Sequence, residues 1–192
     1  MSKNFVVNSN PYGAVTLENV LAFEKLNRFV LPDDYRHYLL HHNGGKFSRR
    51  DFVSKSEPDV DGDVHHMLGL HQGPEHARLQ EGFRLSKYYD LDEFSMSLDR
   101  YFVFADTSTG SLLLLDLKTK GVSVFQPEDV EHESSEPLRH AIHALSDSFT
   151  HFVEDLVSHN KTYSSADELE EFKKKVRQAR LEAGWSINDG ND

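Results

Sequence analysis

Residues 101–126, YFVFADTSTGSLLLLDLKTKGVSVFQ, decide the fold of this 192-residue chain. The stretch holds three apolar runs separated by two turns, which contain Gly110 and Gly121. Short apolar runs bounded by such turns are typical of β-hairpins, so the stretch predicts a three-stranded antiparallel meander. The middle run, residues 112–115, is continuous rather than alternating. This pattern indicates a strand that is covered on both faces, at the centre of a sheet with a helix layer.

Two helices are predicted before the meander. Thr16 is suited to cap a short amphipathic helix whose apolar residues recur at helical spacing to about Asn27. The next segment, residues 31–45, LPDDYRHYLLHHNGG, begins a second helix, because proline is tolerated in a first turn. This helix is predicted to end at residues that readily take the left-handed conformation of many helix C-termini, namely Asn43, Gly44 and Gly45.

The chain is predicted to return to helix after the meander. Ser146 or Ser148 is suited to cap a helix whose apolar face begins at Phe149. A further helix is expected from Ser165, where a capping box precedes apolar residues at alternating steps of three and four. Such a helix is stable only when its apolar stripe is buried. We therefore expect it to dock on its own domain or on a second copy, as a homodimer.

The composition excludes several classes of function. The chain has 21 Lys and Arg against 32 Asp and Glu, a formal net charge of −11, so direct nucleic-acid binding is not expected. The absence of cysteine excludes disulfides, thiol nucleophiles and cysteine-ligated zinc, and it fits a reducing compartment. No apolar run approaches the roughly 20 residues of a membrane span, and the first residues lack a signal-peptide pattern. We therefore expect a cytoplasmic protein that does not contact a membrane.

No motif predicts catalysis or a cofactor. The sequence contains no GxSxG, HExxH, GxxxxGK[ST] or GxGxxG pattern, so we expect neither catalytic residues nor a cofactor. Twelve histidines leave a histidine-rich enzyme as an alternative. His140 and His143 would share a face if residues 138–145 were helical, as a metal site requires. His65 and His66, as neighbours in a strand, are expected to point to opposite faces and not to chelate one ion. We therefore expect no functional metal.

The functional signal is acidity in two predicted loops. The carboxylates of the first loop are Glu57, Asp59, Asp61 and Asp63, and those of the second include Glu128, Asp129, Glu131 and Glu133. The first loop lacks the glycine and glutamate that a calcium-binding EF-hand loop requires at its sixth and twelfth positions. Carboxylates in these loops would attract a basic protein and speed its encounter with this chain. Loops that merely keep the protein soluble have the same composition, so both interpretations stay open.

Three segments, in order along the chain, resemble the SUKH superfamily. This superfamily is named for yeast cell-wall-assembly regulators of the Smi and Knr type and includes many bacterial immunity proteins. The segments are residues 31–45, residues 101–117 and residues 146–156, SDSFTHFVEDL. The resemblance implies an α+β domain with a mostly antiparallel sheet flanked by helices. The residues that carry it are expected to be structural: Pro32, Tyr35, Leu39, Asn43, Gly44, Gly45, Gly110 and Phe149.

The resemblance also implies a role that needs no catalysis. Bacterial members typically bind and neutralise a toxin, frequently one that acts on nucleic acid, and fungal members are interaction proteins in cell-wall regulation. We therefore expect an immunity protein that neutralises a basic toxin domain by stoichiometric binding. The alternative is a regulatory scaffold that binds an endogenous protein. Residues 1–160 are expected to form the SUKH-like domain, and residues 161–192 the appended C-terminal helix and a short tail.

Overall fold

A computed structural model of the chain describes residues 6–54, 57, 59–85, 88, 100–131 and 140–157. All of these residues belong to the compact unit Met1–His159. The helix predicted from Ser165 lies outside the described residues. The domain boundary, the appended helix and the homodimer it would form therefore stay predictions.

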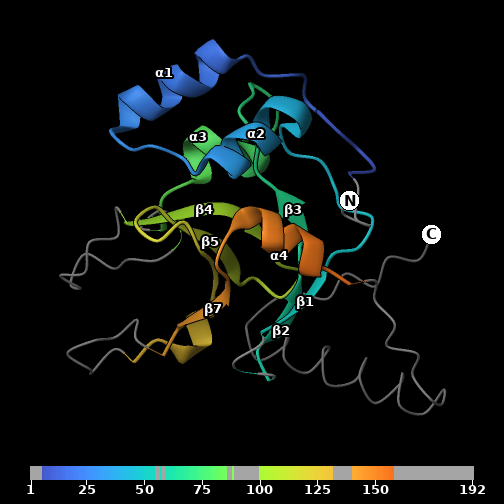
Figure 1. Ribbon diagram of the computed structural model, residues 1–192, viewed down its shortest axis with the longest axis vertical. Coiled ribbons are helices and arrows are strands. Elements are labelled where there is room, and N and C mark those ends of the chain that lie inside the picture. The colour runs from blue at the N-terminus through green and yellow to red at the C-terminus, as the bar shows by residue number, and fades with distance from the viewer. Residues whose placement is uncertain are drawn as a thin grey trace. The chain divides into compact units, whose positions relative to one another are not determined.

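The predicted meander is confirmed, and it forms the centre of an antiparallel sheet (Figure 1). Its strands are β4 (Tyr101–Asp106), β5 (Leu112–Asp116) and β6 (Val122–Phe125). Two more strands, β3 (His66–Met67) and β7 (Ile142–Ser146), extend it to the order β3-β4-β5-β6-β7. Every residue of β5 is buried, as its continuous apolar run predicts. The observed fold class is α+β, as expected.

A separate hairpin consists of β1 (Asp51–Val53) and β2 (Asp61–Asp63). The prediction that the whole acidic segment is a loop is therefore wrong for β2, although Asp and Gly disfavour strands. Packing overrides that preference. Phe52 pairs with Gly62 across the hairpin, and its ring fills the space where a side chain at Gly62 would lie, 2.8 Å from a Cβ position.

The helices predicted after Thr16, within residues 31–45 and after Ser146 or Ser148 form at their predicted places. Thr16 caps α1 (Leu17–Asn27) through a capping box with Asn19, and Ser148 caps α4 (Phe149–Asp155) by accepting the backbone N–H of His151. Between them lie α2 (Asp33–His42), the 3-10 helix η1 (Glu75–Ala77) and the short α3 (Leu79–Gly82). Figure 1 shows α2 and α4 on the sheet. They are joined directly, since the backbone N–H of Thr150 donates to Asp34 Oδ2 at 2.9 Å.

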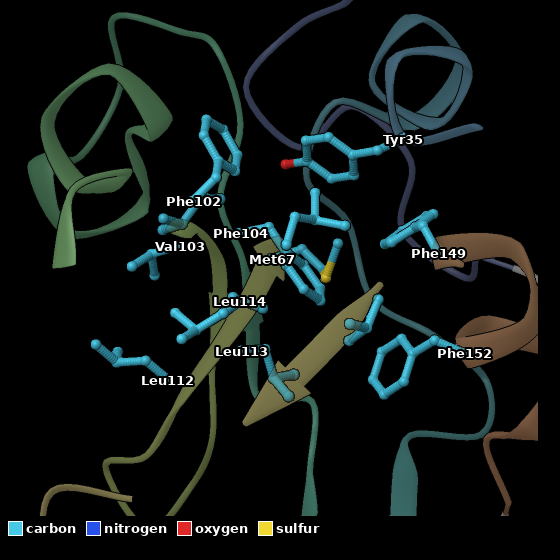
Figure 2. Close-up of a cluster of buried hydrophobic side chains, with 14 of the residues drawn as sticks. Tyr35, Met67, Phe102, Val103, Phe104, Leu112, Leu113, Leu114, Phe149 and Phe152 are labelled. Atoms are coloured by element: carbon cyan, nitrogen blue, oxygen red, sulfur yellow. The ribbon is translucent and has the colours of Figure 1, made fainter. Parts of the chain in front are cut away.

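The core of the domain contains a cluster of aromatic rings between α2, α4 and the sheet (Figure 2). Phe104 lies at its centre, and its ring centroid is 5.8 Å from that of Tyr35, 5.5 Å from that of Phe149 and 6.0 Å from that of Phe152. The register of β4 against β5 shifts between Val103 and Ala105, so Phe104 is the extra residue of a β-bulge. Tyr35, Leu39 and Phe149, three of the residues expected to be structural, are buried in this core.

Asn43 ends α2, and its side chain hydrogen-bonds to the backbone of Gly13 and of Leu70. It has a φ of 32°, and its side chain is fully buried. Its Nδ2 donates to the carbonyl oxygens of Gly13 and Leu70, at 2.8 Å and 2.9 Å. Its Oδ1 accepts the backbone N–H of Leu70 at 2.7 Å. Gly45 has a φ of 90°, and a Cβ there would lie 2.5 Å from the carbonyl oxygen of Asn8. These motif residues therefore serve the fold.

Arg100 forms a bidentate ion pair with Asp116, the last residue of β5. Arg100 Nε donates to Asp116 Oδ1 at 2.9 Å, and its Nη2 donates to Oδ2. The backbone N–H groups of Lys118 and Thr119 also donate to Oδ1. Burial raises the pKa of Asp116, but the hydrogen bond from Arg100 and those from residues 118 and 119 outweigh it and lower this pKa to about 2.

We expect Asp116→Asn to lower the free energy of unfolding by about 2 kcal/mol at pH 7, since each pKa unit corresponds to about 1.4 kcal/mol. A depressed folded-state pKa stabilises the protein above the unfolded-state pKa, near 4. This contribution disappears as the pH falls towards about 2. Urea unfolding at pH 7 and near pH 2.5 measures both values. The exposed Asp59→Asn is the control, and an equal loss in both variants, or a loss independent of pH, would contradict the assignment.

Candidate functional site: an acidic surface

The β1–β2 hairpin is fastened to β7, an edge strand of the main sheet. Ser54, which follows β1 and is buried, donates from Oγ to the carbonyl oxygen of Ala144 in β7 at 3.1 Å. The same Oγ accepts the backbone N–H of Glu57 at 3.2 Å. The backbone N–H of Ser54 donates to the carbonyl oxygen of Val60 and closes the turn. These bonds place the first acidic segment against β7.

His143 of β7 joins the two acidic segments. Its Nδ1 lies 2.8 Å from Glu57 Oε2, and its Nε2 lies 3.2 Å from Asp129 Oδ2. Asp129 ends the 3-10 helix η4 (Pro127–Asp129), which follows β6. Only 12% of the His143 side chain is exposed. His143 therefore lies between one carboxylate of each acidic segment.

The two acidic segments therefore meet at Glu57 and Asp129, and we call their described carboxylates together the acidic surface. It consists of Glu57, Asp59, Asp61, Glu128, Asp129 and Glu131. All of them are exposed except Asp129, which is half-buried. Glu131 also lies 4.0 Å from Nε2 of the exposed His140.

One predicted site residue, Asp63, is not on this surface. Asp63 points back to the main sheet, where its Oδ1 accepts the N–H and the hydroxyl of Ser108 at 2.9 Å and 2.6 Å. Its Oδ2 lies 3.9 Å from Nε of Arg50, and 15% of the side chain is exposed. Asp63 thus anchors the hairpin to the turn between β4 and β5. Glu133 lies outside the described residues.

The helical arrangement considered for His140 and His143 is wrong. Ile142 pairs with Phe125 of β6, so the segment extends the sheet as a strand, and His140 lies before that strand. His143 serves the acidic surface instead. No local pattern in the sequence singles it out, because its partner Glu57 is 86 residues away along the chain.

A second cluster of titratable side chains lies at the opposite edge of the sheet. The ligand atoms of His65, His66 and Asp106 all lie within 4.8 Å of one another. The expectation that the two histidines point to opposite faces is wrong: their ring centroids are 3.8 Å apart. His65 precedes β3, so the alternation of a regular strand does not govern its side chain.

Comparison with known proteins identifies the family of this chain. The SMI1 / KNR4 family (SUKH-1) matches residues 14–155, which span α1 through α4. This family includes immunity proteins and Smi/Knr regulators, and its members are generally non-catalytic proteins that bind other proteins. A search of the curated proteins found no match. None of the helices in the described part of the chain has the length and apolarity that a membrane crossing demands. Because the match covers most of the chain, this protein belongs to the SMI1 / KNR4 family (SUKH-1).

Proposed function

We propose that this protein is an immunity protein that neutralises a cognate toxin by stoichiometric binding, without catalysis. The acidic surface is the proposed contact, and the partner is a basic toxin domain. The observation that carries the proposal is the meeting of Glu57 and Asp129 at His143. Through this contact, two acidic segments that are distant in sequence present their charges together.

Charge supports the choice of partner. A toxin that acts on nucleic acid needs basic residues to hold phosphate groups, and exposed carboxylates can occupy the same residues. The net charge of −11 adds long-range attraction, which raises the association rate for a basic protein. We place the protein in the cytoplasm, where its target would act. The absence of cysteine suits that compartment.

The second candidate function is that of a regulatory scaffold for an endogenous protein, as in the Smi/Knr members of the family. The same acidic surface would serve it, so the surface alone does not separate the two roles. The gene neighbourhood does. A neighbouring gene for a large secreted protein with a toxic C-terminal domain favours immunity. The immunity role is tested directly by expressing that toxin domain in cells with and without this protein and measuring their survival.

The acidic surface is tested by neutralising three of its exposed carboxylates in the full chain, as Asp59→Asn, Glu128→Gln and Glu131→Gln together. We expect affinity for the neighbouring toxin domain to fall by more than about tenfold, mainly through a slower association rate with weaker salt dependence. Surface plasmon resonance at two salt concentrations measures both quantities.

The matched control removes the same number of charges elsewhere. It combines changes at three exposed positions on α1, α3 and α4: Glu18→Gln, Glu81→Gln and Glu154→Gln. We expect this control to change affinity by less than about twofold, since a local interface depends on nearby charges more than on net charge. Equal affinities for the two triple variants would contradict the assignment. Loss of binding in Leu26→Ser with Val30→Ser alone would move the interface to the exposed apolar end of α1.

A further inference from the structure

The pairing of β3 with β4 brings together three side chains of the types that bind metal ions: His65, His66 and Asp106. His66 pairs with Asp106 across the ladder. The backbone N–H of His65 donates to the Asp106 carbonyl oxygen at 2.9 Å, and that of His66 donates to Asp106 Oδ1 at 2.8 Å. Asp106 is thus fixed against both histidines by backbone hydrogen bonds. A site built on paired strands holds its ligands more firmly than one on loops alone.

The distances in this cluster suit a single small ion. Nδ1 of His66 lies 3.3 Å from Asp106 Oδ1, and Nδ1 of His65 lies 3.9 Å from the same oxygen. Two ligand atoms at about 2.0–2.1 Å from a tetrahedral zinc ion are about 3.3 Å apart. The first distance already meets that value, and the second must shorten by about 0.6 Å. Rotation of the half-exposed His65 ring supplies such a shift.

The donor set selects the kind of ion. Two imidazole nitrogens with one carboxylate suit zinc, nickel, cobalt or copper, whereas calcium and magnesium require oxygen ligands. The side chains of His65, His66 and Asp106 are 42%, 38% and 37% exposed, so an ion has access from solvent. Three protein ligands leave the fourth tetrahedral position for water. The ring of His76 on η1 is 6.0 Å from that of His66 and borders the site.

We propose that His65, His66 and Asp106 bind one divalent transition-metal ion of the zinc type. The proposed function does not require this site, because β3 and β7 are opposite edges of the sheet and the acidic surface adjoins β7. A bound ion would join the segment that begins β3 to the end of β4.

Zinc titration of the full chain, purified without a histidine tag and stripped with a chelator, tests the proposal. We expect one zinc ion per chain in competition with a chromogenic chelator. His66→Gln and Asp106→Asn are each expected to weaken zinc binding by more than about tenfold, because losing a group that only hydrogen-bonds a metal ligand already costs about 10–100-fold. Circular dichroism of each variant confirms that it is folded.

The matched control is His41→Gln. His37 and His41 lie one helical turn apart on α2 with ring centroids 4.1 Å apart, so they form a competing histidine pair. The proposal expects His41→Gln to bind zinc like the unmodified chain. It also expects zinc to shift the imidazole ¹⁵N resonances of residues 65 and 66. Zinc binding lost in His41→Gln but kept in Asp106→Asn would overturn it, and so would no binding by the unmodified chain.

Discussion

Replacing Asn43 with alanine is expected to lower the free energy of unfolding by about 3–4 kcal/mol. The change removes three hydrogen bonds and leaves the N–H and carbonyl of Leu70 and the carbonyl of Gly13 without their partner. Because these three backbone groups are only partly buried, each left unpaired costs about 1 kcal/mol, the low end of the range for buried groups. Alanine at a φ of 32° adds up to about 1 kcal/mol, because it lacks the short polar side chain that lets asparagine tolerate the left-handed region.

Urea unfolding measures this loss, and Asn10→Ala is the matched control. Asn10 also has a positive φ, 52°, and its Nδ2 makes one exposed hydrogen bond, to the carbonyl oxygen of His41. We expect Asn10→Ala to cost about 1–2 kcal/mol from backbone strain and that one bond. If both variants lost the same stability, the buried contacts of Asn43 would contribute nothing. Asn43→Asp keeps the acceptor for Leu70 but sets a buried carboxylate oxygen against the carbonyl oxygens of Gly13 and Leu70, so it should cost at least as much as Asn43→Ala.

Phe104→Ala is expected to cost about 3–5 kcal/mol, the range for removing a buried phenylalanine ring. Phe104 is fully buried and touches the rings of Tyr35, Phe149 and Phe152, so its loss opens a cavity between α2, α4 and the sheet. A bulge residue has little freedom to move into the cavity, because its backbone carbonyl is held by the N–H of Leu68 at 2.9 Å.

Thermal and urea unfolding of Phe104→Ala test this, with Leu26→Ala as the control. Leu26 is 81% exposed, so its truncation should change the free energy of unfolding by less than about 0.5 kcal/mol. Phe104→Leu retains part of the packing and should be less damaging than Phe104→Ala. A loss below about 1 kcal/mol for Phe104→Ala would show that the ring cluster is not the centre of the core.

Local signals in the sequence predicted most of the fold. The continuous run in β5, the capping residues Thr16 and Ser148 and the stop at Asn43 each act within a few residues, so their structural outcome follows from their neighbours. The strand β7 was not predicted, because it forms only through pairing with the exposed edge of β6. Sheet contacts of that kind outweigh the weak preferences of residues 142–146.

The candidate site was predictable only in part. The acidic residues could be found in the sequence. The contact between the two acidic segments could not, because it depends on His143 and Glu57, which are 86 residues apart along the chain. The orientation of the Asp63 side chain towards the main sheet likewise depends on its hydrogen bonds with Ser108, 45 residues later in the chain. The arrangement of His65 and His66 depends on where β3 begins, which sequence patterns place with the least accuracy.

The contact between α2 and α4 has a consequence for the order in which the protein folds. Asp34 and Thr150 are separated by 116 residues, whereas β4, β5 and β6 are neighbours along the chain. Closing so long a loop is entropically costly, so the meander is expected to nucleate folding and α4 to dock late. A nascent or cleaved chain that stops before Phe149 would expose the aromatic face of its sheet, a target for chaperones and proteases.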